Sequence, residues 1–148
     1  MAKLAGYMIT WTTYGSWLPG NERGYVRKGK IYSANDKLKE ASRRQQKHPT
    51  VSLSPQERQI VRRTILLEAQ GIGQTIRAVA VCANHVHIVA ESCRQSIEQV
   101  VSRYKNKAMF ELRKLGRDGR IWTRGFDKRF CFSEADLQNK INYVNKHV

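Results

Sequence analysis

Serine residues predict where three helices begin, and these three starting points constrain the fold more than any other feature. Ser54-Pro55-Gln56-Glu57 places serine at the N-cap, proline at the first helical position and glutamate three residues after the cap. This is a capping box, in which the serine and the glutamate each bind a free backbone N–H group of the first turn. The helix is expected to run to about residue 70 and to stop at Gly71.

The same signal occurs twice more along the chain. Ser96-Ile97-Glu98-Gln99 forms a second capping box, and the helix it opens carries a periodic apolar face and is expected to end at Gly116. The face contains Ile97, Val101, Tyr104, Ala108 and Leu115. Ser133 is expected to cap a last helix that continues through the remaining residues.

Segments rich in β-branched and aromatic residues lie between these helices and predict four strands. They cover residues 7–13, 75–82, 85–91 and 121–132, the last with a bend, and Ala83-Asn84 can form a two-residue turn. The order strand, loop, helix, strand, strand, helix, strand, helix predicts an α+β fold. It is a ferredoxin-like βαββαβ sandwich, an antiparallel sheet with helices on one face, plus a C-terminal helix.

Size and composition predict a single domain over residues 1–148, because 148 residues with 41% hydrophobic content suffice for one core. Residues 21–50 are polar and basic without clear periodicity, and are expected to form one long surface loop, of the kind that is usually functional or disordered. We find no signal peptide or bilayer-spanning run, and three widely spaced cysteines do not predict a disulfide framework. A cytoplasmic, nucleoid-associated protein is expected.

The charge balance predicts a polyanionic partner. The chain has 27 basic and 12 acidic residues, a formal net charge of +15. Nucleic acid is the expected partner, since each neutralised phosphate releases counterions. A membrane surface is the rival, but no basic amphipathic helix stands out. Basic side chains interleaved with aromatic ones suit single strands; the candidate contacts are Arg23, Tyr25, Arg27, Lys28, Lys30, Arg103, Lys105, Lys107, Arg124, Lys128 and Arg129.

Two histidines lie one residue apart in the strand segment Ala83-Asn84-His85-Val86-His87-Ile88-Val89. Side chains at i and i+2 of a strand point to the same face, so His85 and His87 project side by side. If the first two helices cover the Val86 and Ile88 face, both imidazoles lie on the open face. They can then chelate a cation or simply be polar residues on a solvated sheet.

The last helix provides further candidates. At 100° per residue, one stripe is apolar and a second row runs along its flank. The stripe contains Leu137, Ile141, Val144 and Val148, and the row contains Asp136, Lys140, Tyr143 and His147. Tyr143 and His147 are neighbours at i and i+4, so they can meet the two strand histidines, although a boundary aromatic and a frayed helix end would give the same pattern.

With these residues identified, the chain resembles the single-tyrosine HUH transposases, the small enzymes of insertion sequences and their REP-associated relatives. The resemblance rests on ITWTTYGSWLPG near the start, on ANHVHIV and on the ending INYVNKHV. It implies that His85, His87 and His147 bind a divalent metal and that Tyr143 is the nucleophile. Many relatives have asparagine or glutamine where this chain has His147.

The resemblance also implies an activity and partners. The expected activity is cleavage and rejoining of single-stranded DNA through a covalent 5′-phosphotyrosine. Mg²⁺ or Mn²⁺ is the expected metal, with Zn²⁺ as the alternative, and the expected partners are DNA hairpins at element ends and a second copy in a homodimer. Lys140, one turn before Tyr143, is a candidate for activating the phenol, whose ordinary pKa is near ~10.

Other functions remain open at this stage. A sheet with helices on one face also describes RNA-recognition modules. A domesticated relative that only binds repeats would share the charge and the fold. Three histidines around an open metal position also describe hydrolytic zinc sites.

Overall fold

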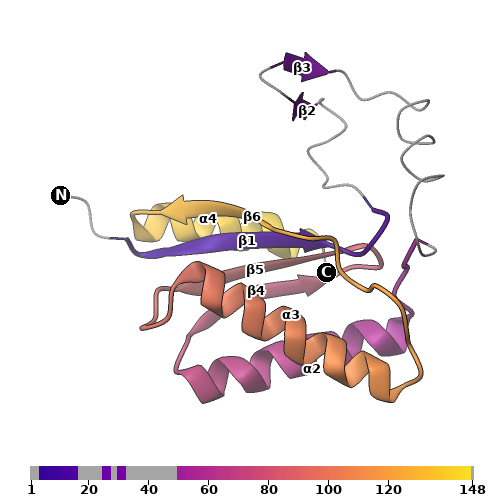
Figure 1. Cartoon of the computed structure of the whole chain (residues 1–148). Helices are drawn as coiled ribbons and strands as arrows, with labels where there is room; N and C mark the ends of the chain where they lie inside the picture. The colour runs from indigo at the N-terminus through magenta and orange to yellow at the C-terminus, as the bar shows by residue number, and fades with distance from the viewer. Residues whose placement is uncertain (1–3, 17–24, 28–29, 33–49, 148) are drawn as a thin grey trace.

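The computed structural model describes residues 4–16, 25–27, 30–32 and 50–147 (Figure 1). In chain order, the helices and strands are β1 (Gly6–Thr12), β2 (Tyr25–Arg27), β3 (Lys30–Tyr32), α2 (Pro55–Ile72), β4 (Ile76–Val81), β5 (His85–Glu91), α3 (Ile97–Lys114), β6 (Asp127–Cys131) and α4 (Glu134–Asn145). None of the helices in this part of the chain is both long and apolar enough to cross a membrane.

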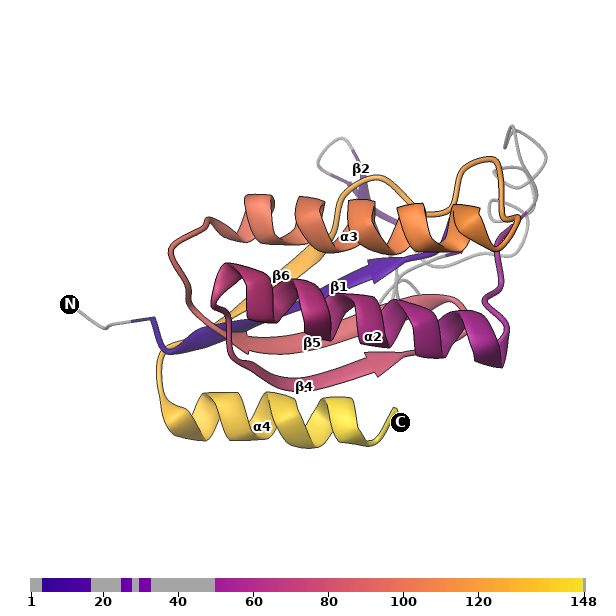
Figure 2. The same cartoon turned by 90° about the horizontal axis from the view of Figure 1, so that it is seen from below.

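The predicted α+β class is confirmed. Four strands form an antiparallel sheet in the order β4-β5-β1-β6, so that β1 lies between β5 and β6. Helices α2 and α3 pack side by side on one face of this sheet, and α4 packs against the other face (Figures 1 and 2). The face that was expected to be open is therefore covered along part of its length by α4.

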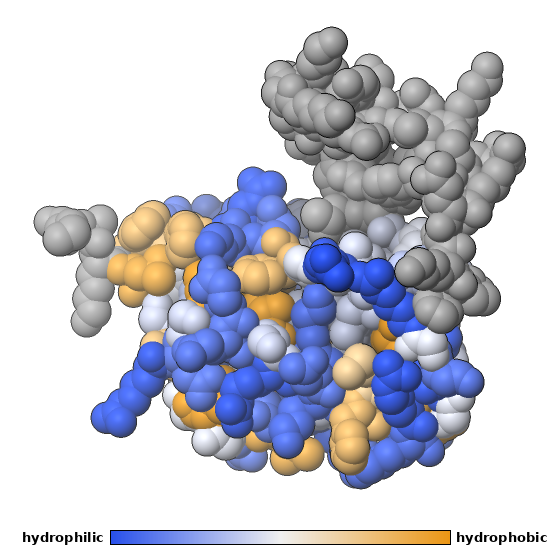
Figure 3. All heavy atoms as spheres, viewed as in Figure 1, coloured by the Kyte–Doolittle hydropathy of each residue, from blue (hydrophilic) through white to orange (hydrophobic). Residues whose placement is uncertain are grey.

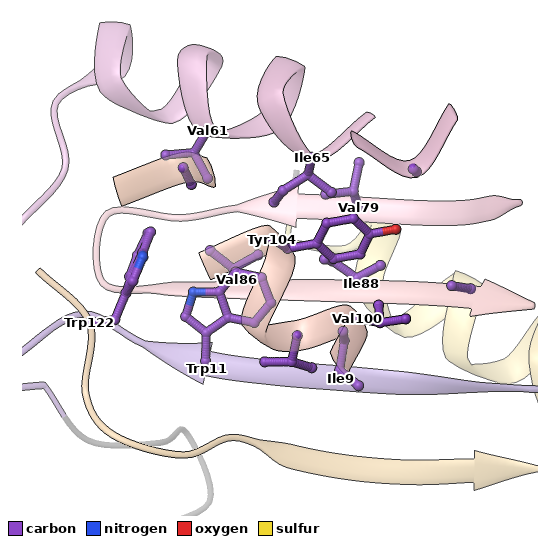
Figure 4. Close-up of a cluster of buried hydrophobic side chains, with 14 of the residues drawn as sticks. Ile9, Trp11, Val61, Ile65, Val79, Val86, Ile88, Val100, Tyr104 and Trp122 are labelled. Atoms are coloured by element: carbon purple, nitrogen blue, oxygen red, sulfur yellow. The ribbon is translucent and has the colours of Figure 1, made fainter. Parts of the chain in front are cut away.

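Alternation along β1 divides the side chains between two cores. Tyr7, Ile9 and Trp11 point toward α2 and α3, where they join side chains such as Ile65 and Tyr104 in the larger core (Figure 4). All five are at most 2% exposed. The odd-numbered positions of β1 thus build the main hydrophobic layer, which leaves the even-numbered positions for the other face.

The second core is smaller and lies beneath α4. It consists of Met8, Ala78, Ala80, Val89, Cys131, Leu137 and Val144, with Ala5 and Ile141 packed against it. Leu137 and Val144 are at most 1% exposed. Three of the four residues expected in the apolar stripe of this helix therefore contact the sheet; the fourth, Val148, lies outside the described residues.

Gly6 permits the close approach of α4. A Cβ atom at this position would meet the carbonyl oxygen of Ala90 and would lie 2.9 Å from Cδ2 of Leu137. The first of these atoms belongs to the backbone of the neighbouring strand and cannot move independently of the sheet. Only glycine fits between β5 and α4 at this point.

Several predicted boundaries differ from the structure. Helix α2 continues through Gly71 and ends at Ile72, because the left-handed cap is Gly73, with φ of 72°. In α3, Leu112 is buried, whereas Leu115 lies beyond the last helical residue and is 49% exposed. The fourth strand of the sheet is confined to β6; Trp122 forms an isolated bridge to Thr13 before the bend.

The prediction of one continuous loop over residues 21–50 is wrong for six of its residues. Strands β2 and β3 pair with each other in antiparallel register, Tyr25 with Tyr32 and Val26 with Ile31. Each strand contains an aromatic and a β-branched residue, which favour strands. The strands are only three residues long and carry basic residues, so the alternation is too short to detect in the sequence.

Replacement of Gly6 by alanine is expected to destabilise the protein by about 1–3 kcal/mol, because the added methyl group clashes with the Ala90 carbonyl and displaces α4. Gly71→Ala is the matched control. Gly71 lies in α2, where an added Cβ atom would meet nothing within 4 Å, so this change should stabilise the helix by roughly 0.5–1 kcal/mol. Chemical denaturation of both variants measures the difference; equal effects would contradict the role of Gly6.

Candidate metal and nucleophile site

Three histidines from two elements converge at one end of the sheet. His85 and His87 lie on the same face of β5, and His147 follows the last turn of α4. One ring nitrogen from each histidine lies within 4.8 Å of the others. The ring centroids are 4.6 Å apart for His85 and His87, and 4.8 Å apart for His87 and His147. The convergence expected from sequence is therefore present within one chain.

Each histidine uses its Nδ1 atom for a hydrogen bond inside the protein. His85 Nδ1 lies 2.7 Å from Oδ1 of Asn84, and His147 Nδ1 lies 2.9 Å from the backbone oxygen of Tyr143. Both oxygens can only accept, so each Nδ1 carries the proton and donates it. His87 Nδ1 lies 2.8 Å from the hydroxyl of Thr10, a buried bond that fits the same tautomer.

This arrangement leaves the Nε2 lone pairs free to bind a cation. Nε2 of His85 and Nε2 of His87 are buried and have no hydrogen-bond partner in the described part of the chain. Buried polar atoms without partners are uncommon and call for an explanation. A metal bound through Nε2, with Nδ1–H bonded to a neighbouring oxygen, is the usual arrangement for histidine ligands. The residues present therefore fit a divalent metal.

The donor set bears on which metal fits. Neutral imidazoles favour Zn²⁺ and other transition metals, whereas Mg²⁺ prefers oxygen ligands and retains several waters. The three protein donors are all nitrogens. Zn²⁺ thus fits the three protein ligands better than Mg²⁺ or Mn²⁺, which would need additional oxygen ligands for much of their coordination.

The electrostatics of the site favour the uncharged histidines that metal binding requires. Burial lowers the pKa of His87 to about 3, with smaller contributions from His85 and His147. Burial likewise lowers the pKa of His85, and His147 adds to this effect. His87 is only 2% exposed. Both imidazoles are therefore neutral at physiological pH.

Tyr143 lies beside the three histidines but remains accessible. Its ring centroid is 4.7 Å from that of His147 and 5.5 Å from that of His87, and the residue is 40% exposed. The phenol thus borders the candidate metal position from the solvent side. A large substrate can therefore reach Tyr143 from solvent, whereas His87 lies behind it in the protein.

Two neighbours of the histidines were not identified from sequence. Thr10 and Asn84 bond to His87 and His85, respectively. Alternation in ITWTT places Thr10 and Thr12 on one face of β1, and the register pairs Thr10 with His87 and Thr12 with His85. The alternation is visible in the sequence, but the pairing between strands 77 residues apart is not.

The candidate DNA contacts divide into several groups. Arg23 and Lys28 lie outside the described residues, and Tyr25, Arg27 and Lys30 lie in β2 and β3, whose side chains are not described. Lys107 and Arg124 are exposed. Ion pairs join Arg103 to Glu68, Lys128 to Glu98 and Arg129 to Asp127. Lys105 donates to the backbone oxygens of Thr123 and Gly125, and therefore supports a loop. Figure 3 shows hydrophilic side chains over much of the face seen in Figure 1.

Lys140 lies in α4 near the sheet, where its charge lowers the pKa of the Cys131 thiol, although burial of that thiol outweighs it. Its influence on Tyr143 stays a prediction.

Comparison with known proteins extends only to the fold. No protein-family model matches the chain, and no curated protein sequence is significantly similar. A REP-associated tyrosine transposase bound to a REP hairpin has a similar structure, with a TM-score of 0.58 and 13% sequence identity. The match covers 96% of this chain but 65% of that protein, so this chain spans less than two thirds of its length.

A second solved structure comes from Deinococcus radiodurans R1 and is provisionally described as a transposase. It has 15% identity and a TM-score of 0.48, over 99% of this chain and 93% of that one. The resemblance to tyrosine transposases that was noted in the sequence is thus confirmed by the first likeness at the level of the fold.

The metal-free protein should lose stability as the pH falls below about 6.5. An unfolded histidine titrates near ~6.5, whereas buried His87 titrates at about 3, so between these values the unfolded state binds more protons. The unfolding free energy should fall by about 1–2 kcal/mol from His87 alone between pH ~6.5 and ~5. Denaturation at several pH values with a chelator tests this; His87→Gln should flatten the slope, and an unchanged slope would contradict the assignment.

Thr10→Val should weaken metal binding roughly 10- to 100-fold, because it removes the partner that orients His87 while preserving side-chain shape. Thr12→Val is the matched control, since Thr12 is equally buried on the same strand but its hydroxyl bonds to the Ser16 carbonyl. Calorimetric titration with Zn²⁺ and Mn²⁺ measures both affinities. Equal losses in the two variants would show that Thr10 has no specific role.

Proposed function

We propose that this protein is a metal-dependent enzyme that cleaves and rejoins single-stranded DNA through a covalent bond to Tyr143. The observation that carries the proposal is the placement of Tyr143 beside three histidines whose ligand atoms lie within 4.8 Å of one another. The fold shared with a REP-associated tyrosine transposase supports it. The net charge of +15 supports a nucleic-acid substrate.

The roles of the side chains follow from their chemistry. His85, His87 and His147 would hold the cation through Nε2. When bound, a divalent cation supplies charge neutralisation at the non-bridging oxygens of a phosphodiester. The phenolic oxygen of Tyr143 attacks phosphorus, forming a phosphotyrosine bond while the bond from phosphorus to the 3′ oxygen breaks. The phenol proton is lost and the departing 3′ oxygen gains one, so the step is balanced.

The covalent intermediate explains why rejoining needs no external energy source. The phosphotyrosine bond retains the energy of the original phosphodiester, and a free 3′ hydroxyl can attack it in the reverse reaction. Transfer to a second DNA end is therefore as accessible as resealing the first. This reversibility suits strand transfer better than hydrolysis.

The substrate we propose is single-stranded DNA with adjoining hairpins, as at the ends of a mobile element. The structural neighbour was bound to a REP hairpin, and the basic surface suits such a partner. A homodimer is proposed by resemblance to relatives. The three histidines and Tyr143 that we propose as the site lie together within one chain.

Tyr143→Phe separates covalent strand transfer from its rivals. The variant should form no protein–DNA adduct, and nicking should fall by roughly 10³-fold or more, because the nucleophile is absent. A denaturing gel with labelled hairpin DNA and Mn²⁺ or Mg²⁺ detects the adduct, and a chelator provides the control. Nicking that survives in Tyr143→Phe would indicate a metal-activated water. Binding without nicking by the wild type would indicate a repeat-binding protein.

A further inference from the structure

A groove of about 450 Å³ lies between α3 and residues 120–126, on the side of the sheet opposite α4. Its lining includes Lys105, Asn106 and Arg113 from α3 and Arg120, Arg124 and Phe126 from the following segment. Buried Trp122 contributes to the base of the groove and donates from its indole nitrogen to the Lys105 carbonyl. The base of the groove is thus formed by a buried, hydrogen-bonded side chain, and long basic side chains line it.

The charges around this groove are unbalanced. Glu98 is the only carboxylate in the lining, and it pairs with Lys128 outside the groove. No ion pair is found for Arg113, Arg120 or Arg124 within the part of the chain that the structure describes. The guanidinium group of Arg120 lies over the Tyr14 ring at 5.3 Å, and Arg113 contacts the Met109 sulfur. These contacts orient the cations without neutralising them.

Lys105 is destabilised in its charged form by burial and by the neighbouring arginine. Its ammonium is half-buried and lies 2.9 Å from the Thr123 oxygen and 3.0 Å from the Gly125 oxygen. Burial lowers its pKa, and the charge of Arg120 lowers it further. The Lys105 ammonium thus bonds to neutral oxygens while Arg120 repels it, and a bound anion would relieve this repulsion.

We propose that this groove binds backbone phosphates of the nucleic acid, away from the phosphodiester that reacts at Tyr143. The proposal rests on the proposed function, since it assigns a second contact surface for the same substrate. Arg113, Arg120 and Arg124 provide planar donors that match phosphate oxygens. A polymer with repeated phosphates fits this lining better than one free phosphate, because the three arginines come from two separate segments of the chain.

The groove is coupled to the histidine site through the end of β1. Trp122 bridges to Thr13, and the Thr123 amide donates to the Thr12 carbonyl at 3.0 Å. Thr12 is in turn the register partner of His85. One end of β1 therefore supports the candidate metal site on one face and the groove on the other, so a DNA strand passing this end can contact both.

The salt dependence of DNA binding tests the proposal. A triple variant, R113Q/R120Q/R124Q, is compared with R62Q/R63Q/R94Q, which removes the same charge from exposed arginines outside the groove. Both are made in the full chain with Tyr143→Phe, and the probe is a hairpin with a single-stranded extension. The slope of log affinity against log salt should fall in magnitude by about 2 in the groove variant, since each phosphate contact contributes ~0.7–0.9.

The control should change the slope by less than half as much. Equal changes in the two variants, or no change in the groove variant, would overturn the groove, because diffuse attraction would then explain binding. Absence of DNA binding before any arginine is changed would overturn both proposals. The adduct assay on the protein with Tyr143 intact distinguishes the two proposals when DNA does bind. If no adduct forms but the slopes change as expected, strand transfer alone is refuted. If an adduct forms but the slopes do not change, phosphate binding in the groove alone is refuted.

Discussion

The packing of α4 against the sheet is the interaction on which the candidate site depends. His85 and His87 are fixed by β5, but Tyr143 and His147 reach them only because α4 lies close to the strands. Small residues in the strands allow α4 to pack this close to the sheet. Gly6 leaves no room for a methyl group, and alanines at two positions of β4 face the same helix. The charged groups of Arg77 and Glu134, 2.5 Å apart, join β4 to the first turn of α4.

The site combines two backbone periodicities with a fixed proton arrangement. Residues two apart in a strand share a face, which aligns the imidazoles of His85 and His87. Residues four apart on a helix are neighbours, which places the phenol of Tyr143 beside the imidazole of His147. Hydrogen bonds at Nδ1 leave the Nε2 atoms of all three histidines available as ligands. Burial keeps His87 neutral. A cation that binds His87 therefore displaces no proton from this imidazole, which lowers the cost of binding.

Local patterns in the sequence predicted the fold class and indicated that three histidines and Tyr143 could converge. Capping boxes and alternation are short-range signals, and both capping boxes are present in the structure. Non-local features could not be predicted in this way. The bond between Thr10 and His87 depends on strand register, and the ion pair between Arg103 and Glu68 depends on how α3 packs against α2. The apolar stripe of α4 indicated that this helix packs on the domain, but not how much of the histidine face it would cover.

The presence of two separate cores has a further consequence for how the protein opens. The core beneath α4 is small and rich in alanine, whereas the core beneath α2 and α3 contains the large aromatic side chains. Local opening requires least free energy where little apolar surface is buried. Detachment of α4 would remove Tyr143 and His147 from the site while the four-stranded sheet stays folded. The integrity of the candidate site would then follow a local opening equilibrium of one helix, distinct from global unfolding.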